Sequence, residues 1–361
     1  MVPVLQSTYN ISLSQNGLLP FAQGVGAIIV LIISIAIADR FNKRTLMVIA
    51  YIVYNAALYI AAMLPPYWTI VVLFFFVGAG VRLYDALANA NMSELGGEKK
   101  GLFLNVLHGF FGFGALFGPI IASRVLVMYD LSTSLLAIAC ICSVLLIIGL
   151  GFSKNWRKTF PAKEEGKSNE DVHSLAILLK SKTMWLLGLC SMVYAGFVIS
   201  IGTWLPSYIA TLGANTYLAA GVVSFLWVGI ISGRFVYSIL SLKFSMYKLI
   251  FVSTAIGGVA IICASVINTI PSYIAGYACS GFLAGAVVPL CIAIANKEFP
   301  NMSGRISSII ILFVSFGMMI VPPVIGIIAE NVSFYSAIFI LNLCPIIIAA
   351  LSFLLNKCAN K

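Results

Sequence analysis

The chain has 361 residues, of which 61% are apolar and only 9% are charged. Globular proteins in water carry about 25% charged residues, so this composition excludes a water-soluble protein and indicates one surrounded by lipid. The net charge of +10 does not indicate a nucleic-acid binder, because the lysines and arginines form short clusters between long apolar runs and not a stripe with interleaved aromatic residues.

Apolar runs long enough to cross a bilayer, which takes about 20 residues in a helix, recur along the whole chain. Turn-forming residues separate them on one side of the predicted membrane. The sequence therefore predicts an all-α membrane protein with 11 transmembrane helices, at 16–38, 45–63, 68–91, 102–127, 132–152, 184–208, 217–241, 248–268, 271–295, 305–329 and 334–356.

The distribution of basic residues predicts the orientation of the chain. Of the 21 lysines and arginines, 18 lie in alternate connections and at the C-terminal end, and the opposite connections hold none. By the positive-inside rule the basic side is cytoplasmic, which places the C-terminus and the central polar loop, 153–182, in the cytoplasm. We expect a multi-pass protein of the plasma membrane, with one bundle in 1–152 and another in 183–361.

An internal repeat relates the two halves of the chain. The shift of 203 residues that relates them aligns Trp204-Leu205-Pro206 with Met1-Val2-Pro3, and it relates Gly78 to Gly281, Gly114 to Gly317 and Pro119 to Pro322. On this repeat, residues 1–15 are the outer tail of a helix whose body precedes Met1, as a start site assigned too far downstream would explain. We therefore number the 11 runs as spans 2–12 of a six-plus-six architecture.

Two repeats of six spans with a basic central loop resemble the major facilitator superfamily over essentially the whole chain. The turn Asp39-Arg40-Phe41-Asn42-Lys43-Arg44 is similar to the family motif Gly-x-x-x-Asp-Arg-x-Gly-Arg/Lys-Arg/Lys, with Ile35 and Asn42 in place of its glycines. The resemblance implies two six-helix bundles. It also assigns a conformational latch to Asp39, Arg40, Lys43 and Arg44; the alternative is that these charges set the topology only.

Within the superfamily, the chain looks most similar to the fucose–proton symporter group and its sugar-transporting relatives. The similarity rests on Asn105-Val106-Leu107-His108, Trp204-Leu205-Pro206-Ser207-Tyr208 and Ser232-Gly233-Arg234, and it implies a sugar-like solute. Relatives often carry an acid shortly after the Tyr-x-Gly of span 7, whereas Tyr194-Ala195-Gly196 is followed by Phe197-Val198-Ile199. Proton coupling therefore stays open.

Charged side chains inside a bilayer cost about 2.5 to 3.5 kcal/mol each, so we expect them to face a cavity or a partner. Arg82 and Asp85 are three residues apart on a predicted helix and share a face, on which Asn89 follows one turn later. The sequence predicts a solute or proton site on this face. A structural ion pair is the alternative.

Further candidates for the solute or proton cavity are Asn105, His108, Tyr194, Trp204 and Arg234. His108 is the only histidine in a predicted span, and the free pKa of histidine lies near neutrality; a histidine that serves helix packing is the alternative. Trp204 also suits an outer interfacial belt of aromatic residues, which we favour slightly.

The sequence predicts a secondary transporter of a small polar solute, sugar-like by resemblance, that works by alternating access with the proton as candidate coupling ion. An exporter of amphipathic drugs or metabolites is the alternative, favoured by the glycines in 112–118, although helix packing explains those glycines as well. A membrane sensor without transport is a third hypothesis. No phosphate loop, metal-spaced histidine pair or catalytic set is present in the sequence. We therefore expect no enzyme activity, cofactor or metal, no nucleic-acid partner, and a monomer in the lipid bilayer.

Overall fold

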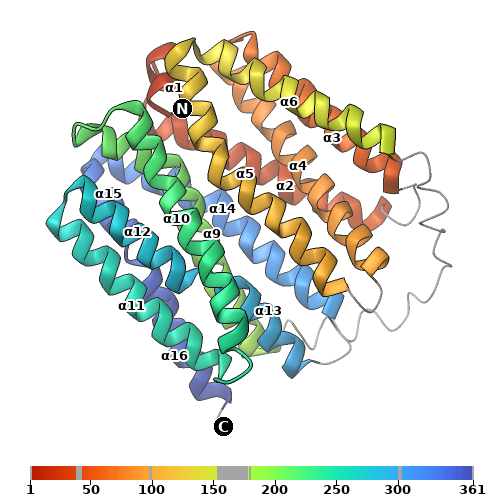
Figure 1. Cartoon of the computed structure of the whole chain (residues 1–361), viewed down its shortest axis with the longest axis vertical. Helices are drawn as coiled ribbons and strands as arrows, with labels where there is room; N and C mark the ends of the chain where they lie inside the picture. Colours follow the sequence, from red (N-terminus) through yellow and green to blue (C-terminus); the bar gives the residue numbers. More distant parts are fainter. Residues whose placement is uncertain are drawn as a thin grey trace. The chain divides into compact units, whose positions relative to one another are not determined.

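The structure is a computed structural model that describes residues 2–37, 43–96, 100–152, 178, 180–299 and 303–359. The regular elements within these ranges are all α-helices (Figure 1). Among the described residues, 11 helical segments are long and apolar enough to cross a membrane. The prediction of an all-α membrane protein with 11 spans is therefore confirmed.

The helices form two units. Unit 1 takes in the described residues of Pro3–Ile11 and Leu18–Glu165, and unit 2 those of Ser12–Gly17 and Gly166–Lys361. The helices of unit 1 are α1 (Val2–Tyr9), α2 (Leu13–Ile37), α3 (Lys43–Ala62), α4 (Tyr67–Gly96), α5 (Lys100–Met128) and α6 (Leu131–Phe152). Those of unit 2 are α9 (Lys182–Thr211), α10 (Thr216–Leu240), α11 (Met246–Ile267), α12 (Ile270–Ala284), α13 (Val287–Glu298), α14 (Ser303–Asn331), α15 (Phe334–Leu341) and α16 (Cys344–Ala359).

The repeat predicted from the sequence is visible in the helix boundaries. Helix α10 begins and ends 203 residues after α2, and α14 begins and ends 203 residues after α5. The starts of α11, α12 and α15 follow those of α3, α4 and α6 by the same number. Both halves of the chain therefore encode the same succession of helices and turns.

Close helix contacts through glycine repeat in the same way. In unit 1, a methyl group on Gly78 of α4 would lie 1.9 Å from the carbonyl oxygen of Gln23 in α2. In unit 2, 203 residues later, a methyl group on Gly281 of α12 would lie 2.5 Å from the carbonyl oxygen of Leu226 in α10. Only glycine permits such a close approach of two backbones. A second matching pair is Gly26 against Phe75 and Gly229 against Ala278.

The start of α2 departs from the expected division of the chain, because Ser12–Gly17 belongs to unit 2 and the rest of α2 to unit 1. Leu13 packs against the apolar core of unit 2. A methyl group on Gly17 would lie 2.8 Å from the Cα of Pro323 in α14. The contacts of this first turn are thus with α14, and a boundary based on span order alone misses them.

Two glycines of α5 make no close helix contact with the described residues. No described atom lies within 4 Å of a methyl group placed on Gly114 or Gly118. In contrast, a methyl group on Gly317, the repeat partner of Gly114, would lie 2.0 Å from the carbonyl oxygen of Met192 in α9.

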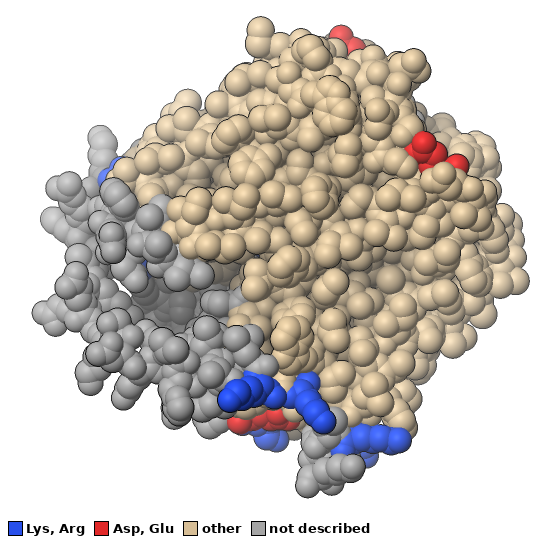
Figure 2. All heavy atoms as spheres, turned by 180° about the vertical axis from the view of Figure 1, so that it is seen from behind, with Lys and Arg blue, Asp and Glu red and all other residues tan. Residues whose placement is uncertain are grey.

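The surface of the helices suits a lipid environment. Large apolar side chains are exposed along the spans, for example Phe110 at 72% and Ile147 at 67%. Charged side chains are sparse among the described residues on the face shown in Figure 2. In unit 2 the basic residues occupy alternate helix ends, with Lys297 in the last turn of α13 and Lys357 in the last turn of α16.

Candidate functional site

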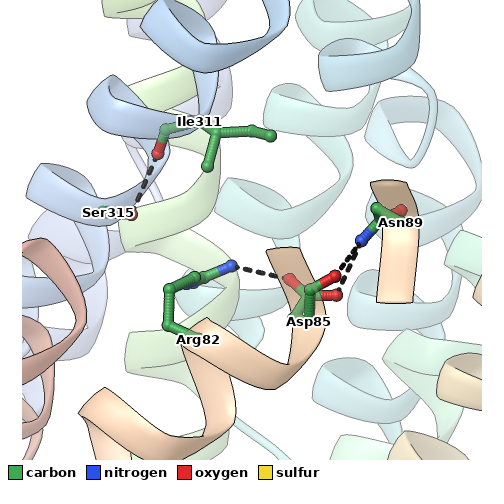
Figure 3. A network of polar contacts seen from close by, with 5 residues as sticks. All are labelled: Arg82, Asp85, Asn89, Ile311 and Ser315. Carbon is green, nitrogen blue, oxygen red and sulfur yellow. Dashed lines mark hydrogen bonds and ion pairs between the residues drawn. The ribbon is translucent and has the colours of Figure 1, made fainter. Parts of the chain in front are cut away.

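A polar stripe lies on α4 of unit 1 and contains the predicted pair Arg82 and Asp85. The Nη1 of Arg82 and the Oδ2 of Asp85 are 3.1 Å apart, and the Nδ2 of Asn89 donates to the Oδ1 of Asp85 at 2.9 Å (Figure 3). The helical spacing of three and four residues brings these groups together. The predicted contacts between the three side chains are therefore present.

The stripe presents hydrogen-bonding groups within an apolar span, Tyr67–Asn89. The Arg82 side chain is 19% exposed and the Asp85 side chain 43% exposed, so neither is sealed in the core of unit 1. The ion pair neutralises both charges, and a carboxylate and a guanidinium can each take part in several hydrogen bonds at once. Such a set can exchange hydrogen bonds with the hydroxyl groups of a polar solute, and the carboxylate can carry a proton.

Other predicted residues of the first half are only partly described. Asn105 and His108 lie in α5, and their side chains lie outside the described part of the structure. Of the predicted latch, Asp39 and Arg40 also lie outside the described residues, and Lys43 and Arg44 form the start of α3.

In unit 2, Arg234 of α10 reaches the junction between α12 and α13. Pro289 has no backbone N–H, so it cannot bond the carbonyl oxygen of Gly285 four residues earlier. The Nε of Arg234 donates to this Gly285 carbonyl at 3.3 Å. The bond satisfies the group that Pro289 leaves unpaired and fixes the orientation of the guanidinium.

Tyr194 of α9 lies beside the same guanidinium. Its side chain is 5% exposed, and its hydroxyl interacts electrostatically with Arg234. The guanidinium can donate to the hydroxyl oxygen, but no described group accepts a hydrogen bond from the Tyr194 O–H itself, which is costly for a buried polar group. The structure thus brings together two of the predicted cavity residues, Tyr194 and Arg234.

Trp204 lies elsewhere, in the apolar core of unit 2. It is 0% exposed, and its Nε1–H donates to the carbonyl oxygen of Pro322 at 2.8 Å. This bond occupies the only polar atom of the indole, so none remains for a solute. The alternative position in an exposed aromatic belt is also wrong, because the residue packs between α9 and α14 and does not face lipid.

Two hydrogen-bond clusters in unit 2 were not predicted, one part-buried around Asn268 and one buried around Asn342. Asn268, which ends α11 in the left-handed conformation, accepts from the hydroxyl of Tyr208 at 2.6 Å and from that of Tyr273 at 3.2 Å. Asn342 accepts from Tyr277 at 2.9 Å and donates to Ser265 at 2.8 Å. Each asparagine is an amide within an apolar stretch of sequence, which is the signal that could have found it. With their partners satisfied, these clusters hold helices together.

The Ser315 hydroxyl of α14 donates to the Ile311 carbonyl of its own helix at 2.9 Å (Figure 3). Within the described residues, no group of three or more histidines, cysteines and acids is placed to hold a metal ion.

Comparison with known proteins gives matches over the whole length of the chain. The family model of the Major Facilitator Superfamily matches residues 1–310 and 228–357. The glucose/mannose transporter GlcP of Bacillus subtilis (strain 168) is 24% identical over 344 residues, which are 90% of this chain and 82% of that protein.

Solved structures share the fold at lower identity. A bacterial homolog of the human lysosomal transporter Spinster, in its inward-facing and unoccupied conformation, has a TM-score of 0.79 and 15% identity, over 98% of this chain and 91% of that one. The fucose:proton symporter FucP of E. coli has a TM-score of 0.64 and 20% identity, over 98% of this chain and 93% of that one.

Proposed function

The chain belongs to the Major Facilitator Superfamily, a family of membrane transporters, and on that premise we propose that it is a secondary transporter of a small polar, sugar-like solute. The observation that carries the proposal is the stripe of Arg82, Asp85 and Asn89, which presents paired charges and an amide within an apolar span. The similarity to a glucose/mannose transporter supports a solute rich in hydroxyl groups.

The mechanism that we propose is alternating access between the two repeats. Matching helices and matching glycine contacts in the two units favour it, because duplicated bundles that move as bodies can expose a central site to either side in turn. We further propose Asp39, Arg40, Lys43 and Arg44 as a latch on the basic side, which we take to be the cytoplasmic side of the plasma membrane.

Proton coupling belongs to the same proposal. Asp85 is the acid that would carry the proton, since it lies within a span beside Arg82 and Asn89. Asn105 and His108 are further candidates for the cavity, on the predictions from their spacing alone. A proton bound at Asp85 would weaken its ion pair with Arg82 and so link the protonation of the site to its solute contacts.

An exporter of amphipathic compounds is the second candidate function. The lack of close contacts of Gly114 and Gly118 with the described residues favours it, because those residues supply no packing reason for a glycine at either position. A thermal-stability screen of the purified full chain separates the two candidates. Stabilisation by neutral hexoses and not by lipophilic cations supports the sugar-like solute, whereas the reverse result supports the exporter.

Transport itself is tested by uptake of labelled hexose into proteoliposomes, with and without an imposed proton gradient. We expect uptake that saturates with concentration, and stimulation by the gradient if Asp85 carries a proton. Binding without any uptake would instead identify a sensor. The variant Asp85→Asn, which keeps the size of the side chain and removes its charge, is expected to lose the response to the gradient.

A further inference from the structure

We propose that Arg234 and Tyr194 bind a carboxylate of the solute, so that the transported compound is a sugar acid such as a hexuronate. The inference rests on the proposed transport function and specifies its solute class. It starts from the charge balance of the described spans, in which one arginine is paired with an acid and another is not.

In unit 1, the ion pair of Arg82 with Asp85 is electrically neutral. In unit 2, Arg234 lies within the span Thr216–Leu240, and it forms no ion pair with any described acid. The two described acids of unit 2 are engaged elsewhere, Glu298 with the hydroxyl of Tyr247 and Glu330 with the backbone of Ser14. A positive charge inside the membrane region therefore lacks a counter-charge from the described residues, which a bound anion would supply.

The orientation of the guanidinium suits an anionic ligand. The Nε–H of Arg234 donates to the Gly285 carbonyl at 3.3 Å. The two terminal nitrogens carry four further N–H groups, of which one can serve the Tyr194 hydroxyl and the others can serve a ligand. A fixed guanidinium that presents paired N–H groups matches the two oxygens of a carboxylate. Since Pro289 creates the vacant Gly285 carbonyl, this orientation is built into the junction between α12 and α13.

The hydroxyl of Tyr194 is the second, independent feature that indicates a ligand. The residue is buried, at 5% exposed, and although the Arg234 guanidinium can donate to the hydroxyl oxygen, no described group accepts from the O–H. A buried donor without an acceptor is unfavourable, and a carboxylate oxygen held by the neighbouring guanidinium would accept a hydrogen bond from it. A single guanidinium with one hydroxyl neutralises one charge, which favours a monoanionic carboxylate over a phosphate dianion.

A purely structural role for Arg234, as the partner of the Gly285 carbonyl, makes a different prediction. That role needs one N–H donor and no charge, so Arg234→Gln would preserve it where the shorter side chain reaches the carbonyl. Anion binding needs the charge and the guanidinium fork. The discriminating quantity is therefore the ratio of affinities for a hexuronate and for the neutral hexose, because loss of fold would lower both.

The test measures binding of D-glucuronate and of D-glucose to the purified full chain in detergent, by competition and by thermal shift. We expect the wild type to bind glucuronate at least about tenfold more tightly than glucose, as for a charge-assisted hydrogen bond. In Arg234→Gln the ratio is expected to fall to about one, and in Tyr194→Phe by a smaller factor. Inorganic phosphate should compete poorly.

Two further variants complete the test. Pro289→Ala restores the N–H that can bond the Gly285 carbonyl, so it is expected to release Arg234 and reduce the glucuronate preference while the charge remains. Lys243→Gln is the matched control, since it removes one exposed positive charge from the turn after α10, and it should keep the wild-type ratio. If Arg234→Gln does not fold, Tyr194→Phe and Arg234→Lys report on the same ratio.

The outcomes separate this inference from the proposed function. If the wild type binds and transports glucose but shows no preference for glucuronate, or if Arg234→Gln keeps the preference, the carboxylate site is wrong and the transporter stands. A ratio that falls equally in Lys243→Gln also overturns the site, because it would indicate a general charge effect. If neither compound binds or moves, the proposed function fails and this inference fails with it.

Discussion

The carboxylate of Glu330, in the last turn of α14, accepts a hydrogen bond from the backbone N–H of Ser14 in the first turn of α2, at 2.7 Å. The first N–H groups of a helix have no acceptor inside the helix, and negative charge is favourable at this end. Ser12 and Gln15 complete the start of α2 with a reciprocal capping box. Glu330 therefore holds the first turn of α2 in unit 2, whereas the rest of this helix belongs to unit 1.

This relationship predicts that Glu330→Gln loosens the start of α2. The substitution keeps the size of the side chain and removes the charge that favours the helix N-terminus, so amide exchange in residues 12–17 should become about twofold to fivefold faster. Hydrogen–deuterium exchange measured by mass spectrometry reports this directly. Asn331→Ala is the control, because the Asn331 side chain bonds within its own helix. Equal exchange rates in wild type and Glu330→Gln would show that the contact does not hold the helix.

The polar stripe of α4 predicts a double-mutant result. Arg82→Gln and Asp85→Asn each leave one charge without its partner in the span, and each should lower the thermal stability. The loss in free energy of unfolding should be smaller than the roughly 2.5 to 3.5 kcal/mol expected for a charge fully buried in lipid, because the Asp85 side chain is 43% exposed. The double variant should recover most of the stability and still fail to transport. Transport at the wild-type rate in the double variant would reduce the pair to a structural role.

The repeat provides a matched pair of glycine substitutions. Gly317→Ala places a methyl group 2.0 Å from the Met192 carbonyl oxygen and should destabilise the protein by about 1 to 3 kcal/mol, as overpacking does. Gly114→Ala, at the equivalent position, meets no atom within 4 Å and should be neutral, or stabilising by up to about 1 kcal/mol through helix propensity. The melting temperatures of the two variants and the wild type in detergent test both expectations. Similar losses in both variants would contradict the contacts described for α5 and α14.

Asp130, which precedes α6, predicts a dependence of stability on pH. Its Oδ1 accepts from the backbone N–H of Thr133 at 2.6 Å, and Thr133 holds the pKa of Asp130 below its ordinary value of 3.8. A lowered pKa in the folded state means that the ionised form stabilises the fold. The stabilising effect is complete at pH values above 3.8 and is lost as the pH falls through the lowered value.

The corresponding measurement compares the melting temperatures of wild type and Asp130→Asn across the acid range. The variant should melt below the wild type at neutral pH, and the difference should shrink at pH values under 3.8. A difference that grows on acidification would contradict the assigned sign. Thr133→Ala is a suitable control, because it retains the backbone N–H that makes the principal bond.

Sequence patterns predicted the parts of this protein that depend on period and length. The spans follow from apolar runs of bilayer length, and the contact between Arg82 and Asp85 follows from their helical spacing. The duplication followed from glycines and prolines that match at one shift of 203 residues, and the structure extends it to helix boundaries and glycine contacts.

The features that escaped prediction depend on which helices become neighbours. The bond from Arg234 to Gly285 joins residues 51 apart, and that from Ser14 to Glu330 joins residues 316 apart. A proline at position 289 removes the helical donor of the Gly285 carbonyl, but the sequence does not indicate which other donor bonds it. For Trp204, an indole near the end of a span has the same local sequence whether it faces lipid or the core, so its burial could not be predicted.

The central claim is that the two repeats move against each other when solute is transported. Distances between spin labels measured by pulsed electron paramagnetic resonance test it, on a protein whose eight native cysteines are replaced. Labels at Met63 in unit 1 and Val332 in unit 2, whose side chains are 81% and 71% exposed, report on movement between the units. Met63 with Met128, which is 66% exposed and also in unit 1, is the control pair.

We predict that the distance distribution between labels at Met63 and Val332 shifts when a transported solute is added, while the distribution between Met63 and Met128 stays the same. Solute uptake by the labelled protein with no shift between the units, or with an equal shift inside unit 1, would contradict the account.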